Sequence, residues 1–164
     1  MGGNFGSDAE DIQYDSKDGE GRAGTREKVS GVNVICGKGT PAGSQRDSKE
    51  NAKEKVQQWL DSGVKVVLVT DGGEPIQYIT REFSGTLASP KMDVKDTTAA
   101  GDSFIGGFLY FLSTKVKSAD DFDAWAENFE NVSEATEFAI RCGAYTVTQY
   151  GAFSALPTQA NIAK

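Results

Sequence analysis

The sequence has no histidine, only two cysteines, and no apolar run long enough to cross a membrane. Without histidine there is no Ser-His-Asp triad, no Cys-His pair and no His-ligated zinc site. Cys36 and Cys142 lie too far apart for a metal knuckle, and one pair makes no disulfide framework, so we expect reduced thiols in a cytoplasmic protein. A membrane helix needs about 20 mainly apolar residues, so we expect no membrane partner.

Positive charge is also scarce. Lysine and arginine total 17 against 24 aspartates and glutamates, which gives a net charge of -7. Nucleic-acid binders usually carry a basic patch, and no Lys/Arg cluster falls on an expected helix face, so we expect no nucleic-acid partner. A small anion can still be held by backbone N–H groups.

The chain divides into two parts by composition. Residues 1–47 are polar and Gly-rich, with charges of both signs and no periodicity apart from Val32–Cys36, where we expect one short strand. Such a composition buries little apolar surface, so we predict that residues 1–47 are otherwise disordered or unassigned. The regular patterns lie in residues 48–164, which we predict to form the folded domain.

The first patterns of that domain indicate an α/β fold. Hydrophobic residues recur at helical spacing between Asp47 and Gly63, which predicts an amphipathic helix. Val64–Thr70 is a nearly continuous β-branched run, typical of a strand buried on both faces. Ile76–Thr80 and Thr86–Ala88 then predict a hairpin. A helix followed by a buried strand is the pattern of a layered α/β protein.

A loop of small residues, Asp96–Asp102, runs directly into the apolar stretch Ser103–Leu112. That stretch predicts a buried helix. Its first N–H groups lack intrahelical partners and lie at the positive end of the helix dipole, so they form a candidate phosphate site. Asp102 in the first turn either balances the dipole or accepts the proton of an attacking hydroxyl in a kinase.

Three stretches carry a resemblance to one family. The residues Asp96–Leu109 resemble the second signature of the ribokinase-like (PfkB) carbohydrate kinases. In the same order, Val66–Gly73 resembles the strand and Thr-x-Gly turn of that family, and Ile140–Ala152 resembles its last helix and closing loop. The resemblance covers about residues 48–164 and implies the C-terminal half of a three-layer α/β/α ribokinase-like sandwich. Its details are most similar to 2-keto-3-deoxygluconate kinases and fructokinases.

The resemblance implies a role for each matching position. Asp102 would be the catalytic base for the sugar hydroxyl. The N–H groups of the anion hole would come from Ala99, Ala100 and Gly101. The residues beside the nucleotide would be Thr70, Gly72 and Gly73, with Ile140, Gly143 and Ala144 on the adenine side. A monovalent cation would be held by Asp96, Thr98 and carbonyls of residues 147–152. The implied cofactors are ATP, Mg²⁺ and K⁺.

The resemblance leaves part of such a kinase unaccounted for. Family members are much longer, and their N-terminal half supplies a Gly-Gly sugar-binding motif and a β lid that this sequence does not show. We therefore expect a small-molecule sugar as substrate, and either a homodimer or a missing N-terminal half as partner.

Three functions remain open at this point. The first is ATP-dependent phosphorylation of a sugar or sugar-acid hydroxyl. The second is a truncated, non-catalytic nucleotide- or phosphate-binding module that lacks the sugar-binding half. The third is an assembly fragment that folds only against that half.

Overall fold

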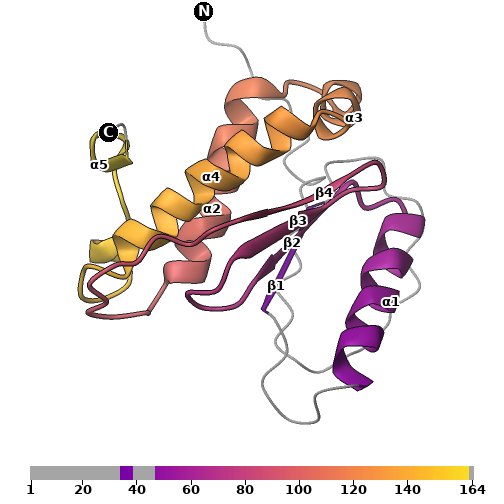
Figure 1. The fold of residues 1–164 in the computed structure, drawn as a ribbon. Coiled ribbons are helices and arrows are strands. Elements are labelled where there is room, and N and C mark those ends of the chain that lie inside the picture. The colour runs from indigo at the N-terminus through magenta and orange to yellow at the C-terminus, as the bar shows by residue number, and fades with distance from the viewer. Residues whose placement is uncertain (1–33, 39–46, 163–164) are drawn as a thin grey trace, which may run out of the picture.

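The computed structural model describes residues 34–38 and 47–162 (Figure 1). Within them a four-stranded sheet separates helix α1 from helices α2 and α4. The strands are β1 Val34–Lys38, β2 Val66–Thr70, β3 Ile76–Ile79 and β4 Ser84–Leu87. The helices are α1 Asp47–Asp61, α2 Ala100–Lys115, α3 Ala119–Ala126, α4 Phe129–Thr146 and α5 Gln159–Ile162, with a 3-10 turn at Phe153–Ala155.

The sheet has the strand order β1-β2-β3-β4. Strands β1 and β2 are parallel, with Cys36 beside Leu68, and α1 lies between them in the sequence. Strands β2, β3 and β4 are antiparallel neighbours, with Leu68 beside Tyr78. The expected early strand is confirmed but lies two residues later, and the expected hairpin is confirmed as β3 and β4. The rest of the prediction for residues 1–47 lies outside the described residues.

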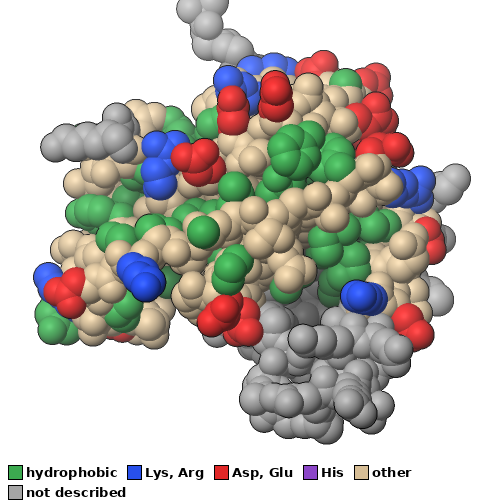
Figure 2. All heavy atoms as spheres, viewed as in Figure 1, with side chains coloured by type: hydrophobic (Ala, Val, Ile, Leu, Met, Phe, Trp, Pro, Cys, Tyr) green, Lys and Arg blue, Asp and Glu red, His purple; other side chains and the backbone are tan. Residues whose placement is uncertain are grey.

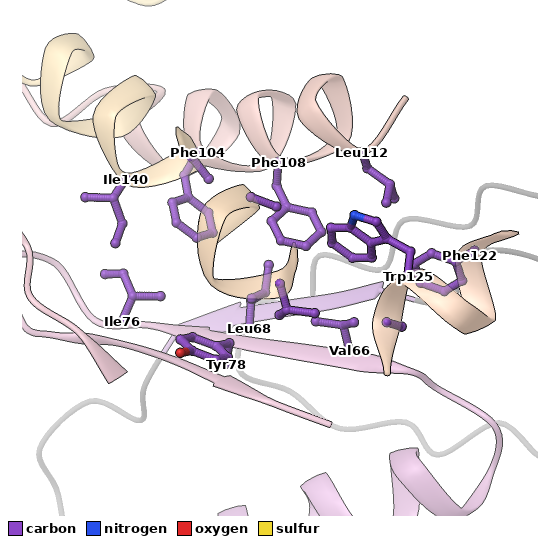
Figure 3. Packing of buried hydrophobic residues seen from close by; sticks show 14 residues of the cluster. Val66, Leu68, Ile76, Tyr78, Phe104, Phe108, Leu112, Phe122, Trp125 and Ile140 are labelled. Atoms are coloured by element: carbon purple, nitrogen blue, oxygen red, sulfur yellow. The ribbon is translucent and has the colours of Figure 1, made fainter. Parts of the chain in front are cut away.

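Strand β2 is buried on both faces, as its β-branched run predicts. Val66 and Leu68 belong to the larger core cluster, between the sheet and helices α2, α3 and α4 (Figure 3). Val67 lies in a smaller cluster with Leu60 of α1. Because side chains alternate along a strand, one short segment holds two helical layers against the sheet. The three-layer α/β/α arrangement follows from this alternation.

Helices α2 and α4 approach closely because two glycines leave room. A Cβ atom on Gly107 would lie 2.6 Å from the Cys142 sulfur, and one on Gly143 would lie 3.2 Å from the Ala100 carbonyl oxygen. At Gly106 a Cβ would meet nothing within 4 Å. Of these adjacent glycines, only Gly107 permits the close packing, because Gly106 faces outward.

The surface of the described part is mixed. Figure 2 shows acidic side chains gathered at the end of the molecule that carries α3, while basic side chains are scattered over the same face. None of the described helices is both long enough and apolar enough to span a membrane.

Candidate functional site

Helix α2 begins after a residue in an unusual conformation. Ala99 precedes the helix with φ 61° and ψ 9°, and among the described residues it is the only non-glycine with a positive φ. This left-handed geometry costs an alanine about 1–2 kcal/mol. A left-handed residue followed by a right-handed one turns successive N–H groups toward a common point, which forms an anion-binding concavity. Backbone strain of this kind collects at functional sites.

The first turn of α2 supplies the N–H groups of that concavity. The first helical hydrogen bond runs from the Ser103 N–H to the Ala99 carbonyl at 2.8 Å, so helix geometry provides no intrahelical acceptor for the N–H groups of Gly101 and Asp102. The Ala100 N–H, in contrast, donates to the Thr97 carbonyl at 3.3 Å. Of the three predicted anion-hole residues, Ala100 therefore shares its donor with the preceding turn.

Space above the first turn is open. A Cβ atom on Gly101 would meet nothing within 4 Å, so no contact with the described residues requires glycine there. Asp102 follows and is exposed, whereas Ser103 is buried. The structure thus presents one carboxylate and several backbone donors together on an accessible helix end. This arrangement can hold an anion and accept a proton from a group beside it.

Asp96 joins the loop before α2 to the loop after α4. Its Oδ1 atom accepts the Thr98 N–H at 2.9 Å, and its Oδ2 atom accepts the Gly151 N–H at 3.0 Å. Hydrogen bonds from the Thr98 side chain, the Gly151 N–H and the Thr98 N–H, in that order, hold the pKa of Asp96 below its ordinary value. The Val147 carbonyl accepts the Lys95 N–H at 2.8 Å beside them. The predicted cation ligands and the closing loop are therefore neighbours.

The oxygen atoms gathered here are of the kind that bind hard cations. Carboxylate and carbonyl oxygens are the ligands that alkali and alkaline-earth ions prefer. In the part of the chain that the structure describes, no group of three or more His, Cys, Asp or Glu side chains is placed to hold a metal ion. The binding of a monovalent cation by Asp96, Thr98 and carbonyls of residues 147–152 stays a prediction.

The predicted nucleotide residues fall into two groups. Thr70 ends β2, and Gly72 and Gly73 follow in a turn closed by the Glu74 N–H and the Asp71 carbonyl at 2.9 Å. Gly72 has φ 55°, which favours glycine. Because ligands of α/β sheets bind beyond the carboxyl ends of strands, this exposed turn is well placed for one.

The second group, on α4, is mainly involved in packing. Ile140 is 5% exposed and lies in the core beside Phe104 and Ile76 (Figure 3), so its side chain offers little surface to a ligand. Gly143 lies against the Ala100 carbonyl, and Ala144 is half-buried. The predicted contact of these three residues with adenine stays a prediction.

One polar contact behind the site was not predicted from the sequence. The Ser103 and Thr146 hydroxyls are buried and hydrogen-bonded to each other at 2.8 Å, although they lie 43 positions apart. The only signal was a pair of threonines, Thr136 and Thr146, on the mainly apolar face of α4. That pattern does not show which of them has a partner on another helix. The Ser103–Thr146 bond joins the first turn of α2 to the last turn of α4.

Comparison with known proteins agrees with this geometry. The pattern of the pfkB family carbohydrate kinases matches residues 39–159. Fructokinase-2 of Zea mays is 39% identical over 115 residues, which are 70% of this chain and 32% of that protein. The chain therefore spans about a third of the length of the curated relative that it matches.

Solved structures of fructokinases are also similar to this chain over part of their length. A fructokinase with bound ATP from Xylella fastidiosa superposes with a TM-score of 0.71 at 26% identity, covering 82% of this chain and 42% of that one. A Vibrio cholerae O395 fructokinase in a fructose-, ADP- and calcium-bound form gives a TM-score of 0.62 at 28% identity, covering 82% and 41%. These matches confirm the predicted α/β ribokinase-like fold. The chain belongs to the pfkB family of carbohydrate kinases.

Proposed function

We propose that this chain forms the nucleotide and anion-hole part of an ATP-dependent sugar kinase, with residues 48–164 as the working domain. The observation that carries the proposal is the start of α2, where Asp102 is exposed in a turn opened by the left-handed Ala99. Fructose is the first candidate substrate, because the relatives and structures described above are fructokinases. A 2-keto-3-deoxy sugar acid is the other substrate class that we consider.

In the proposed reaction a sugar hydroxyl attacks the γ-phosphorus of ATP in line with the leaving ADP. The sugar O–H bond breaks, a new O–P bond forms, and the P–O bond to ADP breaks. Asp102 receives the hydroxyl proton, late in a loose transition state that asks little of the base. The N–H groups of Ala99, Ala100 and Gly101 stabilise the negative charge on the phosphoryl oxygens while the phosphoryl group is transferred.

Two cations would take part in the proposed reaction. When bound, Mg²⁺ neutralises phosphate charge, and this is chemistry that the described side chains do not supply themselves. Asp96, Thr98 and carbonyls of residues 147–152 would hold K⁺ beside the anion hole. Thr70, Gly72, Gly73 and Ala144 would border the nucleotide.

The second candidate is a nucleotide- or phosphate-binding part without its own sugar pocket. The aligned region covers only 32% of the maize relative, and this partial coverage is the reason for considering the second candidate. Such a chain would bind ATP through the same helix end but would need a second copy or a separate N-terminal half before it turned over.

A coupled assay of ADP release distinguishes these candidates. The chain is incubated with ATP, Mg²⁺, K⁺ and either fructose or a sugar acid, and ATP binding is measured separately by calorimetry. We expect Asp102→Asn to lower turnover about 10²–10⁴-fold, the usual contribution of a general base. Asp120→Asn, which changes an exposed acid in the first turn of α3, is the matched control and should leave turnover unchanged.

Each result decides between them. Turnover that survives Asp102→Asn contradicts the catalytic assignment. ATP binding without turnover supports the second candidate, and the absence of both rejects the two together.

A further inference from the structure

Two buried hydroxyl groups lie directly behind the proposed base. Ser103 follows Asp102 in α2 and is 5% exposed, and Thr146 in the last turn of α4 is fully buried. Their oxygens are 2.8 Å apart, and the Thr146 oxygen is also 3.0 Å from the Cys142 carbonyl oxygen. Each hydroxyl can donate one hydrogen bond and accept two, so both are satisfied without water.

This pair differs from the other contacts between α2 and α4, which are apolar or made against glycine. Thr136 gives the internal comparison. It is also fully buried on α4, but its hydroxyl donates to the Val132 carbonyl at 2.7 Å within the same helix and joins nothing across it. A buried hydroxyl alone therefore does not require a cross-helix bond, and the Ser103–Thr146 bond occurs at the end of α2 that carries Asp102.

The Ser103–Thr146 bond is also one of a series of hydrogen bonds that surround the start of α2. Thr146 is followed by Val147, whose carbonyl accepts the Lys95 N–H, and Gly151 then donates to Asp96. From Asp96 the chain leads through Ala99 into the first turn of α2. The Ser103–Thr146 bond is the last of this series. The first turn of α2 is therefore held by the loop that precedes it and by α4.

We propose that Ser103 and Thr146 are a positioning pair, which fixes the first turn of α2 and with it the Asp102 carboxylate and the Gly101 N–H. This inference rests on the proposed kinase function. Transfer requires reacting atoms in close register, and a displacement of about 1 Å can lower the rate by about 10²-fold. The pair touches no reacting atom and acts through the backbone of the turn.

Four variants test the pair by steady-state kinetics. Thr146→Val and Ser103→Ala should each lower kcat about tenfold while changing the KM for ATP less than about twofold, because the turn shifts without losing its ligand groups. Thr146→Ser keeps the hydroxyl and should restore most of kcat. Thr136→Val is the matched control, since it removes a buried hydroxyl from the same helix.

Thermal unfolding separates positioning from stability. Thr146→Val and Thr136→Val should both lower the Tm by about 2–6 °C, the shift expected for one buried hydrogen bond. Only Thr146→Val should lower kcat. Equal kcat for the two variants, or no recovery with Thr146→Ser, would overturn the proposal.

A second readout needs no activity. In ¹H–¹⁵N spectra of the chain, Thr146→Val should shift the amide signals of Gly101, Asp102 and Gly151, and Thr136→Val should leave them in place. If the wild-type chain shows no turnover, the sugar-kinase proposal fails, while these amide signals still decide whether the pair fixes the turn. Unchanged signals in Thr146→Val would reject it.

Discussion

The first turn of α2 and the turns that follow it differ sharply. At the start of the helix, Ala99 is in a left-handed conformation and Asp102 is exposed. Farther along, Phe104, Phe108 and Leu112 are 5%, 1% and 4% exposed and point into the core (Figure 3). The contrast shows how one helix can begin unfavourably and still form, because the burial of its later turns outweighs the strain at its start.

The strongest test of this contrast is to weaken the buried turns. Phe108→Ala should lower the free energy of unfolding by about 3–5 kcal/mol, since it removes a fully buried ring and leaves a cavity. Urea denaturation followed by circular dichroism measures the change. Asp102→Asn should alter the same quantity by less than about 1 kcal/mol. Similar losses from both variants would break the comparison.

Adjacent glycines in the same helix give a paired test of lower magnitude. Gly107→Ala should destabilise the chain by about 1–3 kcal/mol, because the new methyl group would overlap the Cys142 side chain. Gly106→Ala points into open space and should stabilise it by about 1 kcal/mol through helix propensity. Denaturation midpoints of both variants provide the measurement. Stability changes of opposite sign in the two variants would support the comparison, whereas changes of the same sign would contradict the packing described for α2 against α4.

Relieving the strain at the start of the helix should have a smaller effect. Ala99→Gly should raise the free energy of unfolding by about 0.5–1 kcal/mol, because glycine adopts a positive φ freely but loses more entropy on folding. Chemical denaturation again measures it. A destabilised Ala99→Gly chain would mean that the alanine methyl group makes a contact worth more than its strain.

The smallest expected effect is local and depends on pH. Because the folded pKa of Asp96 lies below its unfolded value, its hydrogen bonds stabilise the chain fully above the unfolded pKa, and this contribution is lost as pH falls through the folded one. The amide signals of Thr98 and Gly151 should therefore move together in a titration below about pH 4. In Asp96→Asn neither signal should titrate there. Independent movement of the two signals would contradict a shared carboxylate.

Much of the fold follows from local patterns. The β-branched run that became β2 and the apolar stretch after Asp102 each specify their own secondary structure and burial. The family signature also marks the start of α2 as the candidate site. These features are readable because neighbouring residues determine them.

Other features depend on tertiary packing and were not predictable. Nothing in the chemistry of an alanine indicates the left-handed conformation of Ala99. A helix that is apolar nearly all round does not reveal which of Gly106 and Gly107 faces α4. The Ser103–Thr146 bond links residues 43 positions apart, and only the packed helices bring them together.

The Asp96–Gly151 hydrogen bond has a consequence for how the protein can change in length. It joins residues 55 positions apart, so the segment that contains α2, α3 and α4 begins and ends at the site. Within that segment, helix α3 lies far from the site (Figure 1). Insertions or a chain cut near Val116–Ser118 would leave the meeting point intact, whereas one residue added between Val147 and Gly151 would separate it. The region around α3 is therefore where this part of the chain tolerates variation in length.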